Sequence, residues 1–483
     1  MSYRHGVYVS EVPTSVISPI EATAGLQVVV GTAPINLAKT DEYFSKPLLA
    51  YSLTEAVEAL GYSDDFENYT LCEAMDSSFR LFGVAPVVFI NVLDPETHNT
   101  TGEKEINLVN QKATIDEQGI LLDKLTVKLT NDAAEALVKN TDYLATFDND
   151  GKVVIAIIPG DGVTAEQEKL YVSYTKLDPS KVDNDDIIGG VDVDTGEATG
   201  LELINNVFPK FGLIPGQILA PGFSTEPTVE AVMKAKAGNI NTYFKAAALT
   251  DVDSSTADTY SKVAEWKNQN NYTGANEAVC WPKVALGDKV YHISTQLAGL
   301  NARTDAENGD IPYVSPSNKN LQMNRAVLED GTEVNLGPDQ AAYLNGQGIV
   351  TALNFSGGWK AWGNRTGAYP GTSDVKDTFI PVRRMHNWIA NTIVLTTWQK
   401  VDGPINKRLI ETIVDSLNIW LNGLTSTGAL VGGKVEFRKE ENPTTDLLDG
   451  TVRFHVSLAE PTPAREIEFL LEFDATYYNR LFE

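Results

Sequence analysis

Histidine and cysteine side chains are the residues of this chain with the clearest capacity for metal or acid–base chemistry. The five histidines lie in separate segments, and none falls within one helical turn of another. The sequence therefore lacks the pair of histidines, three or four residues apart, that a metal site on one helix needs. Cys72 and Cys280 are too few for a zinc cluster or a disulfide framework, and we expect two buried thiols.

Two other patterns resemble ligand-binding motifs, but each lacks an essential residue. Gly346 and Gly348 match the first two glycines of a dinucleotide fingerprint, whereas Thr351 occupies the position of the third. An EF-hand loop counted from Asp192 has its glycine at position five instead of six, and Leu203 stands where a carboxylate is needed. We expect both segments to be turns. Weak, adventitious calcium binding at the second stays open.

Sequence motifs for covalent or phosphate chemistry are also missing. The chain contains neither a G-x-S-x-G nucleophile elbow nor a phosphate-binding G-x-x-x-x-G-K-[ST] loop. We therefore expect a protein that is not an enzyme and that has no catalytic residues, no metal and no cofactor. The alternative, an α/β enzyme or a nucleotide-binding protein, is disfavoured because no catalytic motif supports it.

The elements that would position any site alternate between strands and helices from residue 22 onward. We expect helices at 53–60, 69–82, 227–237 and 256–269, and strands at 26–31, 86–93, 216–220, 243–249 and 278–286. Ser52 and Glu55 form a capping-box pattern before the first helix. Such alternation requires crossover connections and a largely parallel sheet, so residues 22–93 and 201–354 are predicted to form an α/β middle domain.

Residues 94–200 interrupt this alternation. Strand-like segments occur at 125–129, 143–147 and 153–158, and Asn149–Gly151 predicts a tight hairpin between the last two. The segment holds 22 acidic residues, nine lysines and no arginine, a net charge of −13 out of −27 for the whole chain. A surface of lysines and carboxylates favours solvent over an interface, and we predict an inserted, outward-facing, acidic β-rich domain.

Residues 355–465 are predicted to form a C-terminal α+β domain. One helix is expected over 383–400, and a second begins with Pro404 and ends at Gly423. The apolar face of the second helix is predicted to contain Ile405, Leu409, Ile410, Ile413, Val414, Leu417, Trp420 and Leu421. Strands are expected at 433–438 and 451–458. The fold class is thus α/β and α+β, with several domains.

The two ends of the chain differ from the rest. Residues 6–12 alternate and are rich in β-branched side chains, within an extended arm formed by residues 1–21. A second alternating segment covers 467–475 within a terminal arm, residues 466–483. Neither strand has a hairpin partner nearby. Each is therefore expected to pair at a distance or with another chain.

The overall charge excludes some partners. With 65 acidic and 38 basic residues among 483, the chain repels the phosphates of nucleic acids and the surface of anionic membranes. The N-terminus lacks the apolar stretch of a signal peptide, and no apolar run approaches the ~20 residues of a membrane-spanning helix. We therefore expect no nucleic-acid partner and no direct insertion into a membrane.

Several short motifs, in order along the chain, resemble those of contractile phage tail sheath proteins. These motifs are H-G-V-Y-V-S-E-V-P at 5–13, V-V-V-G-T-A at 28–33, A-G-L-N-A-R-T-D at 298–305, W-G-N-R-T at 362–366, V-R-R at 382–384 and P-T-P-A at 461–464. One departure is Arg465, which stands where the family often has an acidic residue. Residues 94–200 match no motif of the family.

The resemblance, which extends to contractile bacteriocins, implies a structural subunit that stacks as hexameric rings around a tail tube and contracts to drive the tube through a bacterial envelope. Its implied partners are further copies, the tail tube protein, and baseplate and tail terminator proteins. Its implied location is the virion, after assembly in the host cytoplasm. The family links neighbouring subunits by donated strands. We assign this role to Gly6, Val7, Tyr8, Val9, Glu11, Val12, Ile467, Phe469, Leu471 and Phe473.

A surface for the tube is predicted from charge. Between Phe379 and Gly423 the sequence carries a net charge of +2, against a strongly negative average elsewhere. Lys400, Lys407 and Arg408 are the candidate tube-binding residues. The alternative is that the basic residues of this region neutralise carboxylates within the same subunit.

Overall fold

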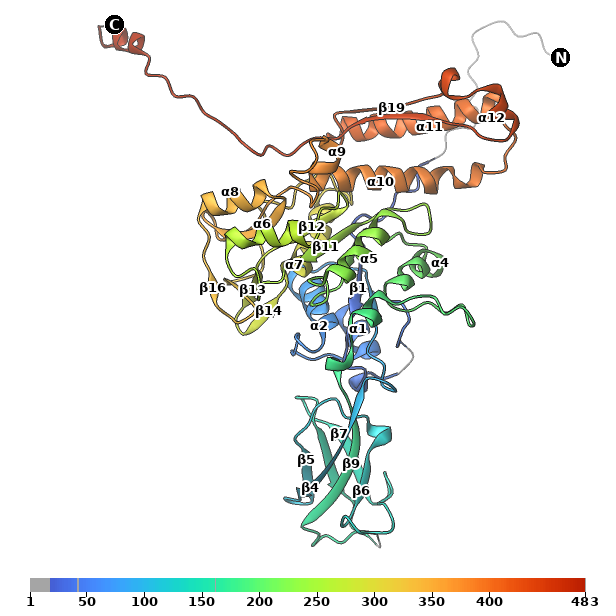
Figure 1. Cartoon of the computed structure of the whole chain (residues 1–483), viewed down its shortest axis with the longest axis vertical. Helices are drawn as coiled ribbons and strands as arrows, with labels where there is room; N and C mark the ends of the chain where they lie inside the picture. Colours follow the sequence, from blue (N-terminus) through green and yellow to red (C-terminus); the bar gives the residue numbers. More distant parts are fainter. Residues whose placement is uncertain (1–17, 41–42, 161, 483) are drawn as a thin grey trace, which may run out of the picture.

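The computed structural model describes residues 18–40, 43–160 and 162–482. The molecule is elongated and has three layers (Figure 1). A β-rich lobe lies at one end, an α/β body in the middle, and a pair of long helices at the other end. The predicted strand over 6–12 lies outside the described residues.

An eight-stranded sheet forms the centre of the body. Its order is β18 (Trp359–Trp362), β17 (Ile349–Asn354), β12 (Glu277–Cys280), β11 (Ala247–Asp251), β10 (Gln217–Leu219), β1 (Gln27–Gly31), β3 (Val87–Asn91) and β2 (Leu48–Ala50). The six inner strands are parallel, and only the two edge strands are antiparallel. Every residue of β1, β3, β10, β11 and β12 is buried, as expected for strands covered on both faces. The predicted parallel sheet is confirmed.

Helices cover both faces of this sheet. They are α1 (Leu53–Leu60), α2 (Thr70–Met75), α5 (Pro227–Gly238), α6 (Tyr260–Gln269), α7 (Ile293–Glu307) and α8 (Pro338–Gly346). The Ser52 hydroxyl accepts a hydrogen bond from the Glu55 backbone at 3.3 Å, which confirms the predicted cap. The predicted helix over 69–82 is present, but its second half, η2 (Asp76–Phe82), is a π-helix. It ends at Gly83, whose φ of 64° suits glycine.

The prediction of a single strand over 278–286 is wrong, because the segment forms two strands that belong to different sheets. Pro282 has no backbone N–H for a ladder and separates β12 from β13 (Lys283–Leu286). The latter belongs to a small antiparallel sheet with β14 (Lys289–Tyr291), β15 (Arg325–Val327) and β16 (Glu333–Val334). The strand predicted to begin at Tyr243 begins only at Ala247.

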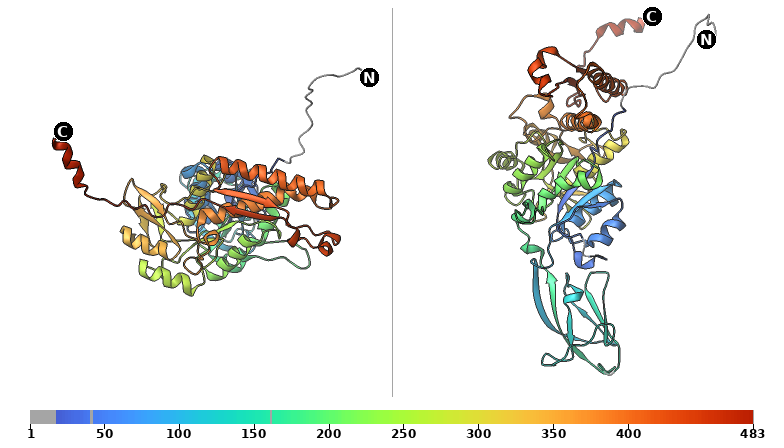
Figure 2. Two further views of the ribbon diagram at one scale, coloured as in Figure 1. Left: turned by 90° about the horizontal axis from the view of Figure 1, so that it is seen from above. Right: turned by 90° about the vertical axis from the view of Figure 1, so that its right-hand side faces the viewer.

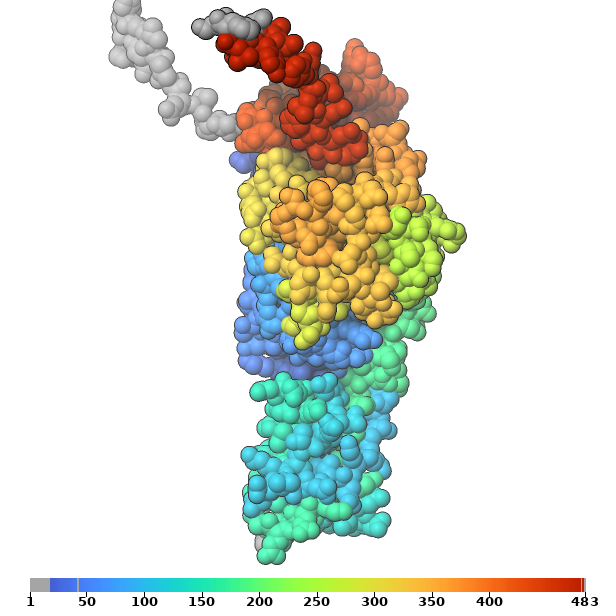
Figure 3. Space-filling model, turned by 90° about the vertical axis from the view of Figure 1, so that its left-hand side faces the viewer, coloured from blue at the N-terminus to red at the C-terminus, as the bar shows by residue number. Residues whose placement is uncertain are grey.

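The insertion forms a lobe of two three-stranded antiparallel sheets. In the space-filling view this lobe projects from one end of the body (Figure 3). The first contains β4 (Asn99–Asn107), β9 (Lys169–Leu177) and β6 (Thr126–Lys128), and the second β5 (Lys112–Ile115), β8 (Val153–Ile157) and β7 (Tyr143–Phe147). Pairing of β7 with β8 confirms the hairpin predicted at Asn149–Gly151. The lobe has its own core, which includes Ile115, Val127, Ile155 and Leu170.

After β9 the chain returns to the body earlier than the predicted boundary at residue 200. Val182 and Ile187 are buried in the core of the body. The connecting elements are η4 (Pro179–Lys181), α3 (Asn184–Ile188), η5 (Gly200–Asn206) and α4 (Val207–Phe211). Short 3-10 turns also occur at η1 (Ile35–Leu37) and η3 (Leu122–Lys124).

The C-terminal layer begins after β18 and thus later than the boundary expected at residue 354. β18 belongs to the central sheet because it forms a hairpin with β17. It contains α9 (Val375–Thr378), α10 (Ile380–Thr397), η6 (Trp398–Lys400), α11 (Lys407–Ser426), β19 (Gly432–Glu436), η7 (Lys439–Glu441), α12 (Thr444–Leu448), β20 (His455–Ala459) and η8 (Ala475–Phe482). Among the described residues, no helix has the length and apolarity to cross a membrane.

The start of α11 differs from its prediction. The helix begins at Lys407 because the Asn406 side chain accepts a hydrogen bond from the Leu409 backbone at 2.9 Å. Pro404 and Ile405 therefore precede the helix, and Ile405 is not part of its apolar face. Ile413, Leu417, Trp420 and Leu421 are buried on that face as predicted.

Candidate intersubunit and tube-binding surfaces

The root of the N-terminal arm lies along α10. The Trp388 indole donates to the Ala22 carbonyl at 2.8 Å. The backbone N–H of Ala22 donates a hydrogen bond to the Thr392 hydroxyl at 3.1 Å. The backbone N–H of Ile20 donates one to the Thr396 hydroxyl, also at 3.1 Å. The chain therefore runs along α10 toward its C-terminal end before the arm leaves the body.

A buried ion pair fixes α10 to the body. The Arg384 guanidinium contacts both carboxylate oxygens of Asp305, at 2.5 and 3.1 Å, and donates to the Ala24 carbonyl at 3.3 Å. The Arg384 and Asp305 side chains are 4% and 2% exposed. Two motifs of the resemblance, at 298–305 and 382–384, thus meet inside one subunit. Arg384 serves cohesion of the subunit and is unavailable to a tube.

The C-terminal segment is extended and lies away from the body (Figures 1 and 2). Ile467, Phe469, Leu471 and Phe473 are between 71% and 96% exposed. Within the described residues this segment pairs with no strand. So many exposed apolar side chains in succession indicate a surface that another chain covers.

A two-stranded sheet lies beside this segment. β19 and β20 pair in antiparallel register from Gly432 with Ala459 to Glu436 with His455. Val435 is buried against α11, whose Asn418 side chain exchanges hydrogen bonds with the Val435 backbone at 2.8 and 2.9 Å. In the part of the chain that the structure describes, each strand of this pair has one unpaired edge. Such an edge is able to accept a further strand.

The predicted tube-binding residues lie at one end of the helical layer. Lys400 ends η6, and Lys407 and Arg408 begin α11, so all three flank the connection between α10 and α11. Lys407 is 89% exposed and makes a long ion pair with Glu411 at 3.4 Å. Trp398 and Val401 are exposed in the same connection. The structure thus brings a cationic and partly apolar surface together there.

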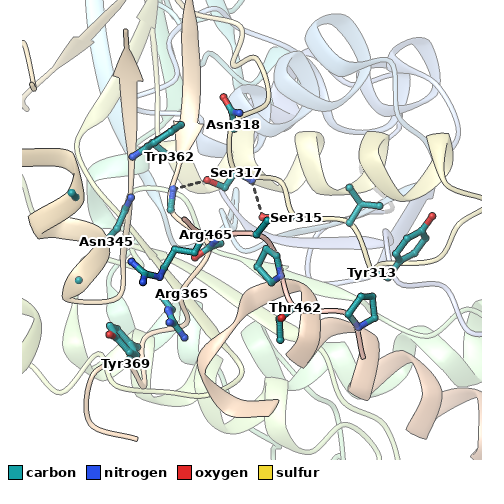
Figure 4. A pocket seen from close by; sticks show the side chains of 18 of the residues that line it. Tyr313, Ser315, Ser317, Asn318, Asn345, Trp362, Arg365, Tyr369, Thr462 and Arg465 are labelled. Carbon is teal, nitrogen blue, oxygen red and sulfur yellow. Dashed lines mark hydrogen bonds between the residues drawn. The ribbon is translucent and has the colours of Figure 1, made fainter. Parts of the chain in front are cut away.

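A cleft of about 610 Å³ lies between β18, α8 and the beginning of the C-terminal segment. Its lining includes Arg365 and Arg465, together with Ser315, Ser317, Asn345 and Trp362 (Figure 4). The Arg365 guanidinium lies 3.7 Å from the ring centroid of Phe379 and 4.2 Å from that of Tyr369. A half-buried guanidinium, that of Arg365, and an exposed one, that of Arg465, line the same cleft, and two cationic groups there suit an anionic ligand.

The arrangement nearest to a catalytic one is enclosed in the body. His292 Nδ1 lies 2.8 Å from a Glu73 carboxylate oxygen, and Asp251 is hydrogen-bonded to Ser224 and Ser294. Burial opposes the charged form of His292, but the Glu73 carboxylate outweighs it and raises the pKa of His292. These groups bind one another and the start of α7. Among the described residues, no group of three or more metal-ligating side chains is placed to hold an ion.

Comparison with family models gives no match. The chain is 26% identical over 510 residues to the tail sheath protein of Burkholderia phage BcepMu, covering 99% of this chain and 98% of the relative. Its fold matches the PVC sheath complex of an extracellular contractile injection system, contracted state, with a TM-score of 0.56, 15% identity and 99% coverage of both chains. A chain in the structure of the anti-feeding prophage (AFP) baseplate also matches with a TM-score of 0.56 and 17% identity. The match covers 98% of this chain and 100% of the other.

The resemblance predicted from the sequence is therefore confirmed. The chain is similar over nearly its whole length to a curated tail sheath protein, and it shares the fold of contractile sheath subunits. These findings support a structural subunit of a contractile tail sheath.

Proposed function

We propose that this chain polymerises as a helical stack of hexameric rings around an inner tail tube and contracts to drive the tube through a bacterial envelope. The observation that carries the proposal is the similarity to a tail sheath protein over 99% of the chain. The subunit works as part of a virion tail, after assembly in the host cytoplasm. Its partners are further copies, the tube, the baseplate and the tail terminator.

Donated strands hold the copies together. Residues 6–12 and 467–475 add to the β19–β20 sheet of neighbouring subunits. Support comes from the exposed apolar side chains of the C-terminal segment and the unpaired edges of that sheet. Main-chain hydrogen bonds at a sheet edge are directional, while the linkers on either side let the angle between subunits change.

The tube is held by many weak contacts. Lys400, Lys407 and Arg408 bind acidic patches on its surface from the α10–α11 connection. Exposed ion pairs each contribute only ~0–1 kcal/mol and are screened by salt. A large number of them fixes the register of sheath and tube, yet each one breaks readily when the sheath expands.

Negative-stain electron microscopy of the purified protein tests this function. We expect rings or tubes of uniform diameter, formed without nucleotide and, with the tube protein added, containing it. A preparation of separate globular particles under all conditions of salt and concentration would overturn the proposal.

A further inference from the structure

Arg365 is a cation stacked between two aromatic rings. Its guanidinium lies between the rings of Phe379 and Tyr369 and donates to the Thr378 hydroxyl at 3.0 Å. In the described part of the chain, no carboxylate forms an ion pair with it. The two rings and the Thr378 hydroxyl position the guanidinium, and one hydrogen bond uses only part of its donor capacity.

Arg465 lies close to Arg365 in the same cleft (Figure 4). It pairs only with the adjacent Glu466, at 2.9 Å, and the two side chains are 59% and 69% exposed. Burial lowers the pKa of Arg365 below its usual value, and the charge of Arg465 acts in the same direction. Two neighbouring cations are unfavourable unless an anion lies between them. The cleft therefore favours a carboxylate from outside the subunit.

A second copy of this chain is the natural source of that carboxylate. Each copy carries a charge of −27, so copies that associate must place cations against carboxylates where they touch. The N-terminal arm, residues 1–21, contains two acidic residues, Glu11 and Glu21. Glu21 accepts a hydrogen bond from the Trp420 indole of its own subunit at 3.3 Å, so Glu11 is the carboxylate of the arm that we assign to a neighbouring copy. Residues 6–12 of the arm alternate and are rich in β-branched side chains, so they are predicted to pair as a strand.

The anchored Ile20 and the cleft lie at opposite ends of α10. Ile20 is hydrogen-bonded to Thr396 in the last turn, whereas Phe379, which stacks on Arg365, precedes the first turn of the helix. An 18-residue helix is ~27 Å long. From Ala24 to Ile20 the chain runs away from the cleft, so a subunit's own arm would have to reverse its direction. In head-to-tail packing, the arm of one copy instead points at the cleft of the next.

The reach and the path of the arm agree with this placement. Glu11 is nine positions from the anchored Ile20, a stretch that spans at most ~30 Å when extended. β20 ends at Ala459, two residues before Pro461 of the cleft lining. A strand that pairs along β20 therefore runs directly into the cleft.

We propose that Arg365 and Arg465 form a carboxylate-binding cleft that receives Glu11 from the N-terminal arm of a neighbouring copy. This inference rests on the proposed function, because it assigns one contact of the sheath polymer. The ion pair fixes the register of the donated strand on β20.

A double-mutant cycle on the full-length chain tests the contact. Glu11→Gln and Arg365→Gln are each expected to raise the protein concentration needed for polymerisation at least about tenfold. The combined variant should be no worse than the poorer single one, and the swap of Glu11→Arg with Arg365→Glu should recover part of the loss. Lys112→Gln, which removes an exposed charge in the lobe, is the matched control and should have no effect. Additive losses without recovery in the swap would overturn the inference.

Cysteine cross-linking tests the same contact without touching the stacked arginine. Cys72 and Cys280 are buried, so introduced thiols react selectively under a mild oxidant. Chains carrying both Glu11→Cys and Arg465→Cys should give a ladder of disulfide-linked multimers. Either single variant supplies only one thiol at each contact and should give no ladder. A bond within one chain, or no bond in a preparation that polymerises, contradicts the inference. If the wild-type chain forms no polymer at all, it is the proposed function that fails.

Discussion

At the scale of residues, the motifs shared with sheath proteins turn out to act within the subunit. Asp305 and Arg384 are 79 positions apart and meet as a buried pair that also binds the backbone of Ala24. They thereby connect α7, α10 and the root of the arm. The Trp388 indole, which donates to the Ala22 carbonyl, adds a second link between α10 and this root.

Asp305→Ala should be strongly destabilising, because it leaves the Arg384 charge buried without a partner. We expect a loss of about 3–5 kcal/mol in the free energy of unfolding, measured by urea denaturation. Arg303→Ala is the matched control on the same helix, since its pair with Glu307 is exposed. The control should lose at most about 1 kcal/mol. Equal effects of the two variants would contradict this role of the buried pair.

A buried carboxylate gives the stability of the body a pH dependence. Burial and the nearby Glu230 carboxylate raise the pKa of Glu277 to about 8. Its oxygens accept from the Thr250 hydroxyl and the Gly274 backbone, both at 2.9 Å. Because the folded state favours the protonated form, this group's contribution is complete below pH ~4.5 and is lost as the pH rises through about 8.

Glu277→Gln mimics the protonated side chain and should remove this dependence. We expect the free energy of unfolding of the wild type, measured by urea denaturation, to fall between pH 5 and 8 by up to about 1.4 kcal/mol per pH unit, and that of the variant to fall less. Glu265→Gln on the exposed side of α6 is the control and should keep the wild-type slope. Parallel slopes for wild type and Glu277→Gln would show that Glu277 is ionised in the folded protein.

At the scale of elements, we predict that the α10–α11 connection of the C-terminal layer contacts the tube. Reversal of Lys407 and Arg408 to glutamate should leave the fold intact, because both side chains are exposed at the first turn of α11. We expect sheath-like polymers that no longer assemble around the tube. The measurement is co-sedimentation of sheath and tube at physiological salt.

The matched control reverses Lys112 and Lys139, two exposed lysines of the inserted lobe. It changes the charge by the same amount and should still coassemble with the tube. Normal tube-filled polymers of the Lys407 and Arg408 variant would exclude this connection as the tube-binding element.

The inserted lobe is predicted to be dispensable for assembly. Asn99 and Leu177 face each other as the first pair of β4 and β9, so the two ends of the lobe are adjacent. Residues 100–176 should therefore be replaceable by a short Gly-Ser linker, with the separate core of the lobe removed as a unit. We expect the shortened chain to polymerise normally.

Limited proteolysis of the assembled sheath checks the outward position of the lobe. The first cuts should fall between residues 94 and 200. Protection of this segment while the body is cut would show that the lobe lies in an interface.

The sequence predicts the body better than the lobe, and the reason is periodicity. Buried parallel strands such as Val28–Val30 are continuous apolar runs, and Ser52 marks its helix by a cap. β4 has only Ile106 buried among nine residues, so no pattern distinguishes it from a loop. Pro404 is a typical first residue of a helix, yet Asn406 provides a side-chain cap and fixes a later start.

The candidate sites were predictable only in part, for a similar reason. Composition identifies apolar ends and a cationic region, because those are local properties of the sequence. The cleft of Arg365 and Arg465 brings together residues a hundred positions apart, and only the fold makes them neighbours.

At the scale of the whole molecule, the anchored Ile20 and the beginning of the C-terminal segment lie toward opposite ends of α10, an arrangement suited to head-to-tail association. Contacts of this kind are heterologous, so they generate rings or helices and not closed pairs. If strand donation links the copies, they stay connected while the body moves as one unit.

The arm is the element on which this account depends most. Sedimentation velocity of the full-length chain and of a chain lacking residues 1–12 tests it directly. We predict that the full-length chain, of 52.6 kDa, sediments as large polymers. The truncated chain should sediment as a folded monomer of slightly lower mass. A truncated chain that polymerises like the full-length protein would contradict the account.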